Sequence, residues 1–235
     1  CALFWGTAVS TTWARINALE TIETYGFAVH QQLLYNFAVH GDFFQTIHMG
    51  YDDAWTWSGH RSLTLVFNGF LYGLSPSALW LSKIHIAEVM AGVIPAALLG
   101  RLALKSDWGL VLGGLLYLGA PPTLALALQD YQDLVLAAPA LLAALVGFSA
   151  RRTWIVVVLA LVGCLPREEC VPLVVACAVI ALPPENRSRR TNLLIGLGVA
   201  AAYTGITSLA FPMADTQHDM PLQNAILGLF HWPPQ

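Results

Sequence analysis

Charged side chains are scarce in this sequence. Only 11% of the 235 residues are charged, whereas 57% are hydrophobic. A soluble domain of this length would need more charge to cover its surface. The formal net charge is −3, and no basic patch is interleaved with aromatic residues, so we expect no nucleic-acid partner. The composition is that of a protein built from membrane helices.

Recognisable catalytic and metal-binding motifs are missing as well. No serine, cysteine or threonine stands in a nucleophile motif, and no HExxH or comparable histidine spacing is present. Cys164, Cys170 and Cys177 lie in or beside apolar runs without metal-ligand spacing, so we expect small buried residues. Any chemistry would therefore be acid–base or metal-assisted work by carboxylates.

The few charges are sorted along the chain. Basic residues between apolar stretches cluster at Arg101/Lys105, Arg151/Arg152 and Arg187/Arg189/Arg190. The acids gather in the alternate loops, at Glu20/Glu23, Asp42, Asp52/Asp53, Asp130/Asp133, Glu168/Glu169 and Asp215/Asp219. Basic loops face the cytoplasm in most membrane proteins. The pattern predicts a multi-pass protein of the inner (plasma) membrane whose acidic loops are extracytoplasmic.

The apolar segments predict an all-α protein with about seven transmembrane helices. Crossing the hydrocarbon layer takes about 20 helical residues. The predicted crossings are 1–16, 77–100, 108–128, 134–150, 153–165, 170–182 and 192–211. The segment 108–128 should break at Pro121-Pro122. The segments 153–165 and 170–182 would each reach only about 20 Å as a helix, so the turn between them should lie below the outer surface.

A long first outer loop separates the first two predicted crossings. Within 17–76, residues 20–38 should form a helix lying along the membrane, with an apolar stripe that His30 and Gln31 fall away from. The stripe is Ile22, Tyr25, Val29, Leu33 and Phe37. Residues 62–75 should form a second interfacial or dipping helix, because a crossing there would put Arg101 outside with the acids.

We expect residues 1–235 to form a single transmembrane domain, in which three parts follow the first predicted crossing. Residues 17–76 form the outer loop, 77–211 form the helix bundle, and 212–235 begin a further outer loop. The chain starts without methionine inside an apolar stretch, so we interpret it as a piece of a longer protein. A lipidated Cys1 is the alternative.

Three groups of polar residues are candidates for a site. Arg167, Glu168 and Glu169 stand between the two short helices, where charges at membrane depth usually face a cavity; a solvated turn is the alternative. The first loop mixes carboxylates with histidines, which could bind a divalent ion or be plain interfacial residues. Lys83, His85 and Glu88 lie in the outer half of one helix. Lys83 and Glu88 are five apart, a poor intrahelical pair, so we expect them to face an aqueous cavity or partners on other helices; a structural ion pair is the alternative.

Short motifs in order along the chain carry a family resemblance. The run from Tyr25 to Asn36, followed by His40-Gly41, resembles the first-loop signature of prokaryotic polytopic membrane proteins of unknown function that are predicted relatives of GT-C-type glycosyltransferases. Further matches are Gly59-His60, Leu74-Ser75-Pro76, Pro95 before Arg101, Asp130-Tyr131 and Arg167-Glu168-Glu169. The similarity runs through about residues 20–182.

The resemblance implies the N-terminal module of a GT-C-like fold. Such enzymes move a sugar from a polyprenyl-phosphate lipid at an outward-facing site, often with a divalent cation, here Mg²⁺ or Mn²⁺. Glu23, Asp42, Glu168 and Glu169 would be catalytic, and Asp42 with Asp52 would bind the metal. The substrate-binding residues would be Arg167, Lys83, His60, Asp130, Gln32 and Asn36.

Two departures from the family pattern keep other functions open. Gly26 and Gln31 stand where the family has acidic residues, and Gln132 stands where it has a histidine. A catalytically silent scaffold is one alternative. A transporter or lipid-handling protein that uses the same acidic cavity is the other.

Overall fold

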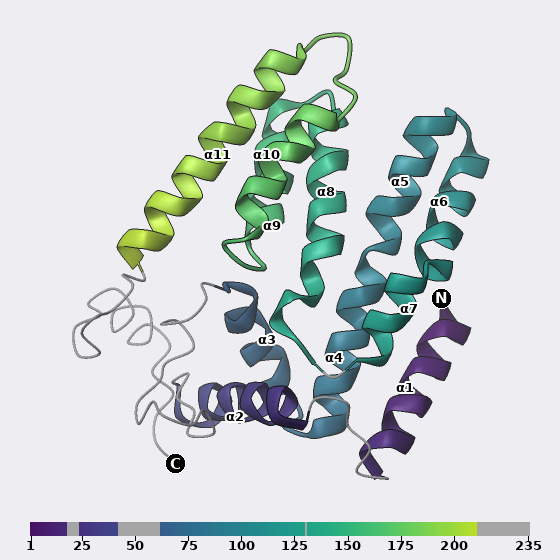
Figure 1. Cartoon of the computed structure of the whole chain (residues 1–235), viewed down its shortest axis with the longest axis vertical. Coiled ribbons are helices and arrows are strands. Elements are labelled where there is room, and N and C mark those ends of the chain that lie inside the picture. Colours follow the sequence, from purple (N-terminus) through teal and green to yellow (C-terminus); the bar gives the residue numbers. More distant parts are fainter. Residues whose placement is uncertain (18–23, 42–61, 130, 211–235) are drawn as a thin grey trace.

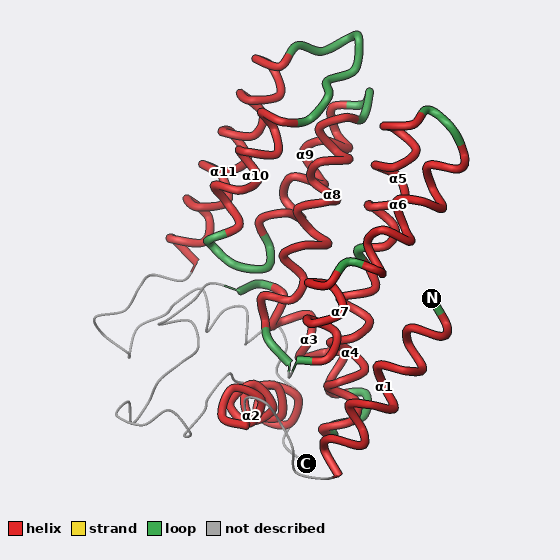
Figure 2. The backbone as a smooth tube through the Cα atoms, turned by 45° about the vertical axis from the view of Figure 1, so that its right-hand side comes forward, coloured by secondary structure: helices red, strands yellow, loops and turns green. Residues whose placement is uncertain are grey.

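The computed structural model describes residues 1–17, 24–41, 62–129 and 131–210. These parts of the chain are helices joined by turns, so the predicted all-α architecture is confirmed for them (Figures 1 and 2). The elements are α1 (Ala2–Asn17), α2 (Thr24–His40), α3 (Thr64–Gly73), α4 (Ala78–Ala91), α5 (Val93–Leu104), α6 (Asp107–Gly119), α7 (Pro121–Leu128), the 3₁₀ helix η2 (Asp133–Leu136), α8 (Ala137–Ser149), α9 (Thr153–Cys164), α10 (Cys170–Ile180) and α11 (Arg189–Ala210).

Two stretches of the described chain are long and apolar enough to cross a membrane. The first is Ala78–Leu104, in which α4 and α5 run on from one another, and the second is Arg189–Leu209. The bent pair α6 and α7 makes a third if it counts as one span. Leu134–Ser149, α9 and α10 are apolar but shorter. Length and composition thus give two to three candidate spans, fewer than the seven crossings that the charge pattern predicts.

The predicted break at Pro121-Pro122 is confirmed. Helix α6 ends at Gly119, α7 begins at Pro121, and the two axes differ by 54°. Proline lacks the backbone N–H that would continue the preceding helix, but it fits the first turn of a new one. The bend places the end of α7 close to both α1 and α4.

A hydrogen bond from α6 stabilises the helix ends at the interruption between α4 and α5. The Tyr117 hydroxyl of α6 donates a hydrogen bond to the Val89 carbonyl, with an O–O distance of 2.7 Å. A Cβ atom at Gly92 would overlap that hydroxyl. The absence of a side chain at Gly92 therefore leaves room for Tyr117. The Tyr117 hydroxyl in turn pairs the Val89 carbonyl next to the interruption, because a broken helix in an apolar setting needs partners for its backbone groups.

Small residues bring the backbones of α5 and α6 into contact. A Cβ atom at Gly109 would overlap the Gly100 carbonyl, and one at Gly113 would overlap the Ala96 carbonyl. Small residues four apart on each helix are the usual means by which membrane helices approach this closely. The turn between α5 and α6 lies at one end of the molecule (Figure 1). Arg101 is in the last turn of α5, and Lys105 directly follows this helix.

Helices α8 to α11 enclose an apolar core, and Arg187 closes the polar end of this core. The Arg187 Nε atom donates to Asn192 Oδ1 at 2.6 Å, and its Nη2 atom donates to the Phe148 and Ala150 carbonyls at 2.8 and 2.7 Å. Asn192 also donates to the Phe148 carbonyl. Burial lowers the pKa of the Arg187 guanidinium. The side chain therefore caps the end of α8, which otherwise has unpaired carbonyls.

The same core confirms the prediction for the cysteines. Cys164, Cys170 and Cys177 are buried free thiols, packed among the apolar side chains of α9 and α10. Two of them belong to the core made by Ala144, Phe148, Val156, Ala160, Cys164, Val174, Cys177, Ala178, Ala181, Val199 and Tyr203. They fill space, as small apolar residues do.

Helix α2 lies across the direction of the other long helices. It runs roughly perpendicular to α8 in Figure 1 and is seen end-on in Figure 2. Leu33, Leu34 and Phe37 bury its apolar face against α3, where Gly69 leaves room for the Phe37 ring. The three basic turns lie at the end of the molecule opposite α2 (Figure 1). The charge pattern of the sequence predicts the same separation, with the first loop and the basic turns on opposite sides of the bundle.

Candidate functional site

A buried polar cluster lies where α3, α4 and the segment before η2 meet. The Asn68 amide nitrogen of α3 donates to Glu88 Oε1 of α4 and to the Tyr131 hydroxyl, each at 2.6 Å. All three residues are at most 6% exposed. Polar groups buried among apolar helices are costly unless hydrogen bonds satisfy them. The Asn68 side chain therefore links α3 to α4 and to the segment that precedes η2.

His85 belongs to the same cluster. Its Nε2 atom lies 2.7 Å from the Leu126 carbonyl near the end of α7. A carbonyl only accepts hydrogen bonds, so Nε2 carries the proton in this contact. The Tyr131 ring packs edge-on against His85, with the centroids 6.0 Å apart, and against His30 of α2 at 5.3 Å. Arg15 of α1 donates to the Leu128 carbonyl, so side chains from α4 and α1 both pair the last carbonyls of α7.

Glu88 has the partner on another helix that the spacing of Lys83 and Glu88 predicts: it is bonded to Asn68 of α3, and no ion pair joins it to Lys83 in the part of the chain that the structure describes. The Lys83 side chain is half-buried. Both residues line an open groove of about 400 Å³, which we name the aromatic groove. Its walls are Trp5, Phe67, Leu71, Trp80, Lys83, Ile84, Ala87, Glu88, Ala91 and Leu136.

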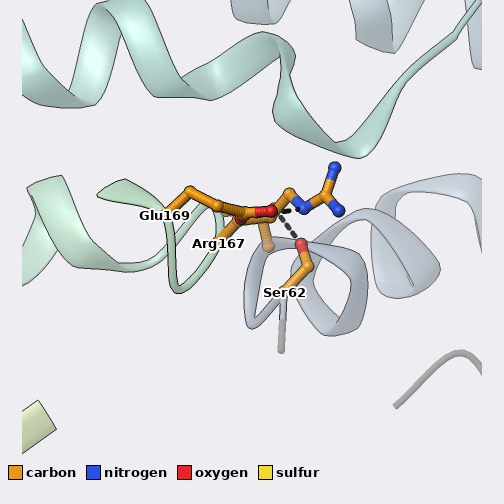
Figure 3. A network of polar contacts seen from close by, with 4 residues as sticks. Ser62, Arg167 and Glu169 are labelled. Atoms are coloured by element: carbon orange, nitrogen blue, oxygen red, sulfur yellow. Dashed lines mark hydrogen bonds and ion pairs between the residues drawn. The ribbon is translucent and has the colours of Figure 1, made fainter. Parts of the chain in front are cut away.

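The charged corner between α9 and α10 lies beside the start of α3. Arg167 Nε is 3.2 Å from Glu169 Oε2, and Figure 3 shows the two side chains meeting next to Ser62. The Arg167 side chain is 14% exposed and that of Glu169 is 53% exposed. The Leu63 amide donates to the Leu165 carbonyl at 3.1 Å, which ties the corner to α3. A fully solvated turn does not fit the burial of Arg167.

A second groove of about 380 Å³ begins at this corner, and we name it the corner groove. It includes Pro166, next to Arg167, and is lined by Leu63, Thr64, Phe67, Ala91, Ile94, Pro95, Leu136, Pro139, Ala140, Ala143, Val162, Leu165 and Pro166. Phe67, Ala91 and Leu136 belong to both grooves. The two grooves therefore adjoin, and they connect the surroundings of Arg167 with Lys83 and Glu88 along an apolar surface.

The structure places the remaining predicted residues as follows. Glu168 is half-buried in the corner, and Gln32 and Asn36 are half-buried one turn apart on α2. Glu23, Asp42, Asp52, His60 and Asp130 lie outside the described residues. Across residues 1–17, 24–41, 62–129 and 131–210, no group of three histidine, cysteine or acidic side chains could hold a metal ion.

His30 and Gln31 contact the bundle although the apolar pattern sets both apart from the stripe. His30 packs on Tyr131, as described above, and Gln31 hydrogen-bonds Tyr72 of α3. Burial raises the pKa of Tyr72, and the hydrogen bond from Gln31 partly offsets that rise. The inner face of α2 is thus partly polar, and it faces the buried cluster.

Asn68 is the central residue that the sequence analysis missed. It stands alone in the apolar run 62–75, between Phe67 and Gly69. A single strongly polar side chain in an apolar helix commonly bonds to a neighbouring helix. The sequence thus contains the signal for Asn68, but it does not identify Glu88 and Tyr131 as the partners of this residue.

The fold and the site define an all-helical membrane protein that holds charged and polar groups among apolar helices. Comparison with family models agrees: the family described as "Predicted membrane protein (DUF2079)" matches residues 18–225. The chain belongs to this family of predicted membrane proteins. No curated protein and no solved structure matches it significantly.

Proposed function

We propose that this chain is the N-terminal module of a GT-C-like membrane glycosyltransferase that uses a polyprenyl-phosphate-linked sugar on the extracytoplasmic face. The observation that carries the proposal is the corner groove, an apolar groove whose lining includes Pro166, the neighbour of the largely buried Arg167. An isoprenoid chain needs an apolar groove, and its phosphate needs a cation at the mouth. The position of Arg167 directly after Pro166 of the corner groove supports a donor bound at the α9–α10 corner.

The donor would be held by its two chemically different parts. The isoprenoid chain would lie along Phe67, Ala91 and Leu136, the walls that the corner groove and the aromatic groove share. The phosphate would lie near Arg167, whose guanidinium can bind two phosphate oxygens at once, or near Lys83. Gln32 and Asn36 of α2 offer amides to sugar hydroxyls.

The transfer itself requires a carboxylate base and a stabilised leaving group. Glu23 or Asp42 of the first loop would take the proton from the acceptor hydroxyl, whose oxygen then attacks the sugar C1 atom. The bond between C1 and the phosphate oxygen breaks, and the polyprenyl phosphate leaves with the electron pair beside Arg167. Glu168 and Glu169 would position Arg167 and the sugar. A divalent cation bound by Asp42 and Asp52 would supply further positive charge to the phosphate.

The proposal includes seven membrane helices. They are α1, the pair α4–α5, the pair α6–α7, and α8, α9, α10 and α11. The common position of the turns 105–106, 150–152 and 181–188 at the end opposite α2 supports this topology (Figure 1). It would put Arg101, Arg151 and Arg190 in the cytoplasm, and α2 on the outer surface of the inner membrane.

The first experiment is native mass spectrometry of the full-length protein purified in mild detergent. We expect a co-purified polyprenyl phosphate or its sugar conjugate, lost in Arg167→Ala and kept in Arg152→Ala. A protein that carries only bulk phospholipid would contradict the proposed donor.

A transfer assay with the identified lipid separates the proposal from its rival. Membranes with the wild-type protein should pass the labelled sugar to an acceptor, and Glu23→Ala and Glu168→Ala should reduce that transfer. Full transfer by both variants would overturn the catalytic roles. Lipid retained without any transfer would favour a lipid-handling protein, because the two grooves accept a lipid in either case.

A further inference from the structure

A third groove opens at the end of the molecule opposite α2, and we name it the basic groove. It has a volume of about 850 Å³, within the range of ligand sites in proteins. The ends of α5 and α8 and the start of the α10–α11 turn form its walls. Three cationic side chains line it: Arg101 and Lys105 at the end of α5, and Arg151 after the end of α8.

Apolar side chains share the groove with these cations. Leu102, Leu145, Ile180 and Leu182 line the same space, and Leu102, Ile180 and Leu182 are 47%, 65% and 67% exposed. Exposed aliphatic residues at the ends of membrane helices meet the acyl chains of the lipid, whereas cations beside them meet the headgroups. The groove therefore has the two-part character of a phospholipid.

The charge balance of the groove favours an anion. Glu185 is its single acidic lining residue, against three cations. Arg101 also lies 3.3 Å from Asp107, but their side chains are 57% and 84% exposed, and ion pairs this exposed contribute little. Arg101 is thus available to a phosphate that approaches from the membrane surface.

We propose that the basic groove binds an anionic phospholipid of the leaflet that faces the basic loops, with its phosphate among Arg101, Lys105 and Arg151 and its acyl chains along Leu102 and Ile180. A doubly charged headgroup of the cardiolipin type fits the three cations better than a singly charged one. The site lies at the other end of the molecule from the proposed sugar-transfer site, and it stands whether or not that function is right.

The test is native mass spectrometry of the full-length protein in mild detergent, titrated with cardiolipin, phosphatidylglycerol or phosphatidylcholine. We expect binding in the order cardiolipin, phosphatidylglycerol, phosphatidylcholine. Arg151→Ala should weaken cardiolipin binding about fivefold, since each basic residue near a lipid surface contributes on the order of a fivefold change. The triple variant R101A/K105A/R151A should weaken it about a hundredfold.

Arg152→Ala is the matched control, because Arg152 is an equally exposed neighbour that does not line the groove. Equal losses in Arg151→Ala and Arg152→Ala would overturn the proposal in favour of unspecific attraction to the basic loops. Equal binding of phosphatidylcholine would overturn it as well. Displacement of cardiolipin by millimolar inorganic phosphate would show a small-anion site instead. Circular dichroism and gel filtration check that each variant is folded.

Discussion

Asn68 of α3 and Glu88 of α4 form a hydrogen bond of 2.6 Å in the apolar interior of the protein. Both residues are nearly inaccessible, with exposures of 1% and 6%. The bond holds a carboxylate at the edge of the aromatic groove and fixes α3 against the helix that begins the first candidate span. It connects the packing of α3 against α4 with the site where we propose that a lipid substrate binds.

We expect the two residues to be energetically coupled. Glu88→Ala and Asn68→Ala should each lower the free energy of unfolding by about 1–3 kcal/mol, because each leaves a buried polar partner without its hydrogen bond. The double variant should lose less than the sum, with a coupling of about 0.5–3 kcal/mol. Thermal unfolding in detergent measures this. The pair Asn68→Ala and Lys83→Ala is the control, and equal coupling in both pairs would contradict the assignment.

Arg187 should matter more to stability than its basic neighbours. Arg187→Ala removes three hydrogen bonds to Phe148, Ala150 and Asn192, and we expect a loss of about 2–4 kcal/mol. Arg190→Ala should change stability by less than about 0.5 kcal/mol, because its side chain is exposed. Chemical unfolding followed by tryptophan fluorescence compares the two. Similar losses would mean that Arg187 contributes only charge.

The α5–α6 hairpin should tolerate no side chain at Gly109. Gly109→Ala would push its Cβ into the Gly100 carbonyl, a backbone atom that cannot move aside, at a cost of about 1–3 kcal/mol. Gly119→Ala, on the same helix but in open space, should not destabilise the protein. Melting temperatures of the two variants in one detergent decide the matter. A stable Gly109→Ala protein would show that the helices can separate.

Filling the shared wall of the two grooves should block the proposed donor site. Ala91→Phe adds a ring to the surface that the corner groove and the aromatic groove have in common. We expect about a tenfold loss of polyprenyl phosphate binding, measured by native mass spectrometry, with little change in melting temperature, because Ala91 is exposed. Ala125→Phe, exposed on α7 and outside both grooves, should bind normally. Unchanged binding by Ala91→Phe would place the lipid elsewhere.

Labelling of single cysteines tests the proposed topology. In a Cys1→Ser background the three other cysteines are buried. A membrane-impermeant maleimide added to intact cells should label Ser75→Cys, between α3 and α4, and leave Arg152→Cys and Glu185→Cys unlabelled until the cells are opened. Labelling of Glu185→Cys in intact cells would contradict the orientation and the two crossings, α9 and α10, that we propose between residues 152 and 185.

Several features follow from the sequence without any structure. Low charge and long apolar runs specify a helical membrane protein, and Pro121-Pro122 specify where α6 ends, because proline cannot continue a helix. The sorting of arginines between alternate segments anticipates the three basic turns at one end. These are local or compositional properties, so they depend little on how the helices pack.

The partners of the polar residues were decided only by the tertiary structure. Glu88 bonds to Asn68 and not to Lys83 on its own helix, and Arg187 of a basic cluster turns inward to the end of α8. Both contacts depend on which helices lie side by side and how they are rotated. In an apolar interior a buried charge must find whatever donor or acceptor packing brings within reach, and sequence spacing does not contain that information.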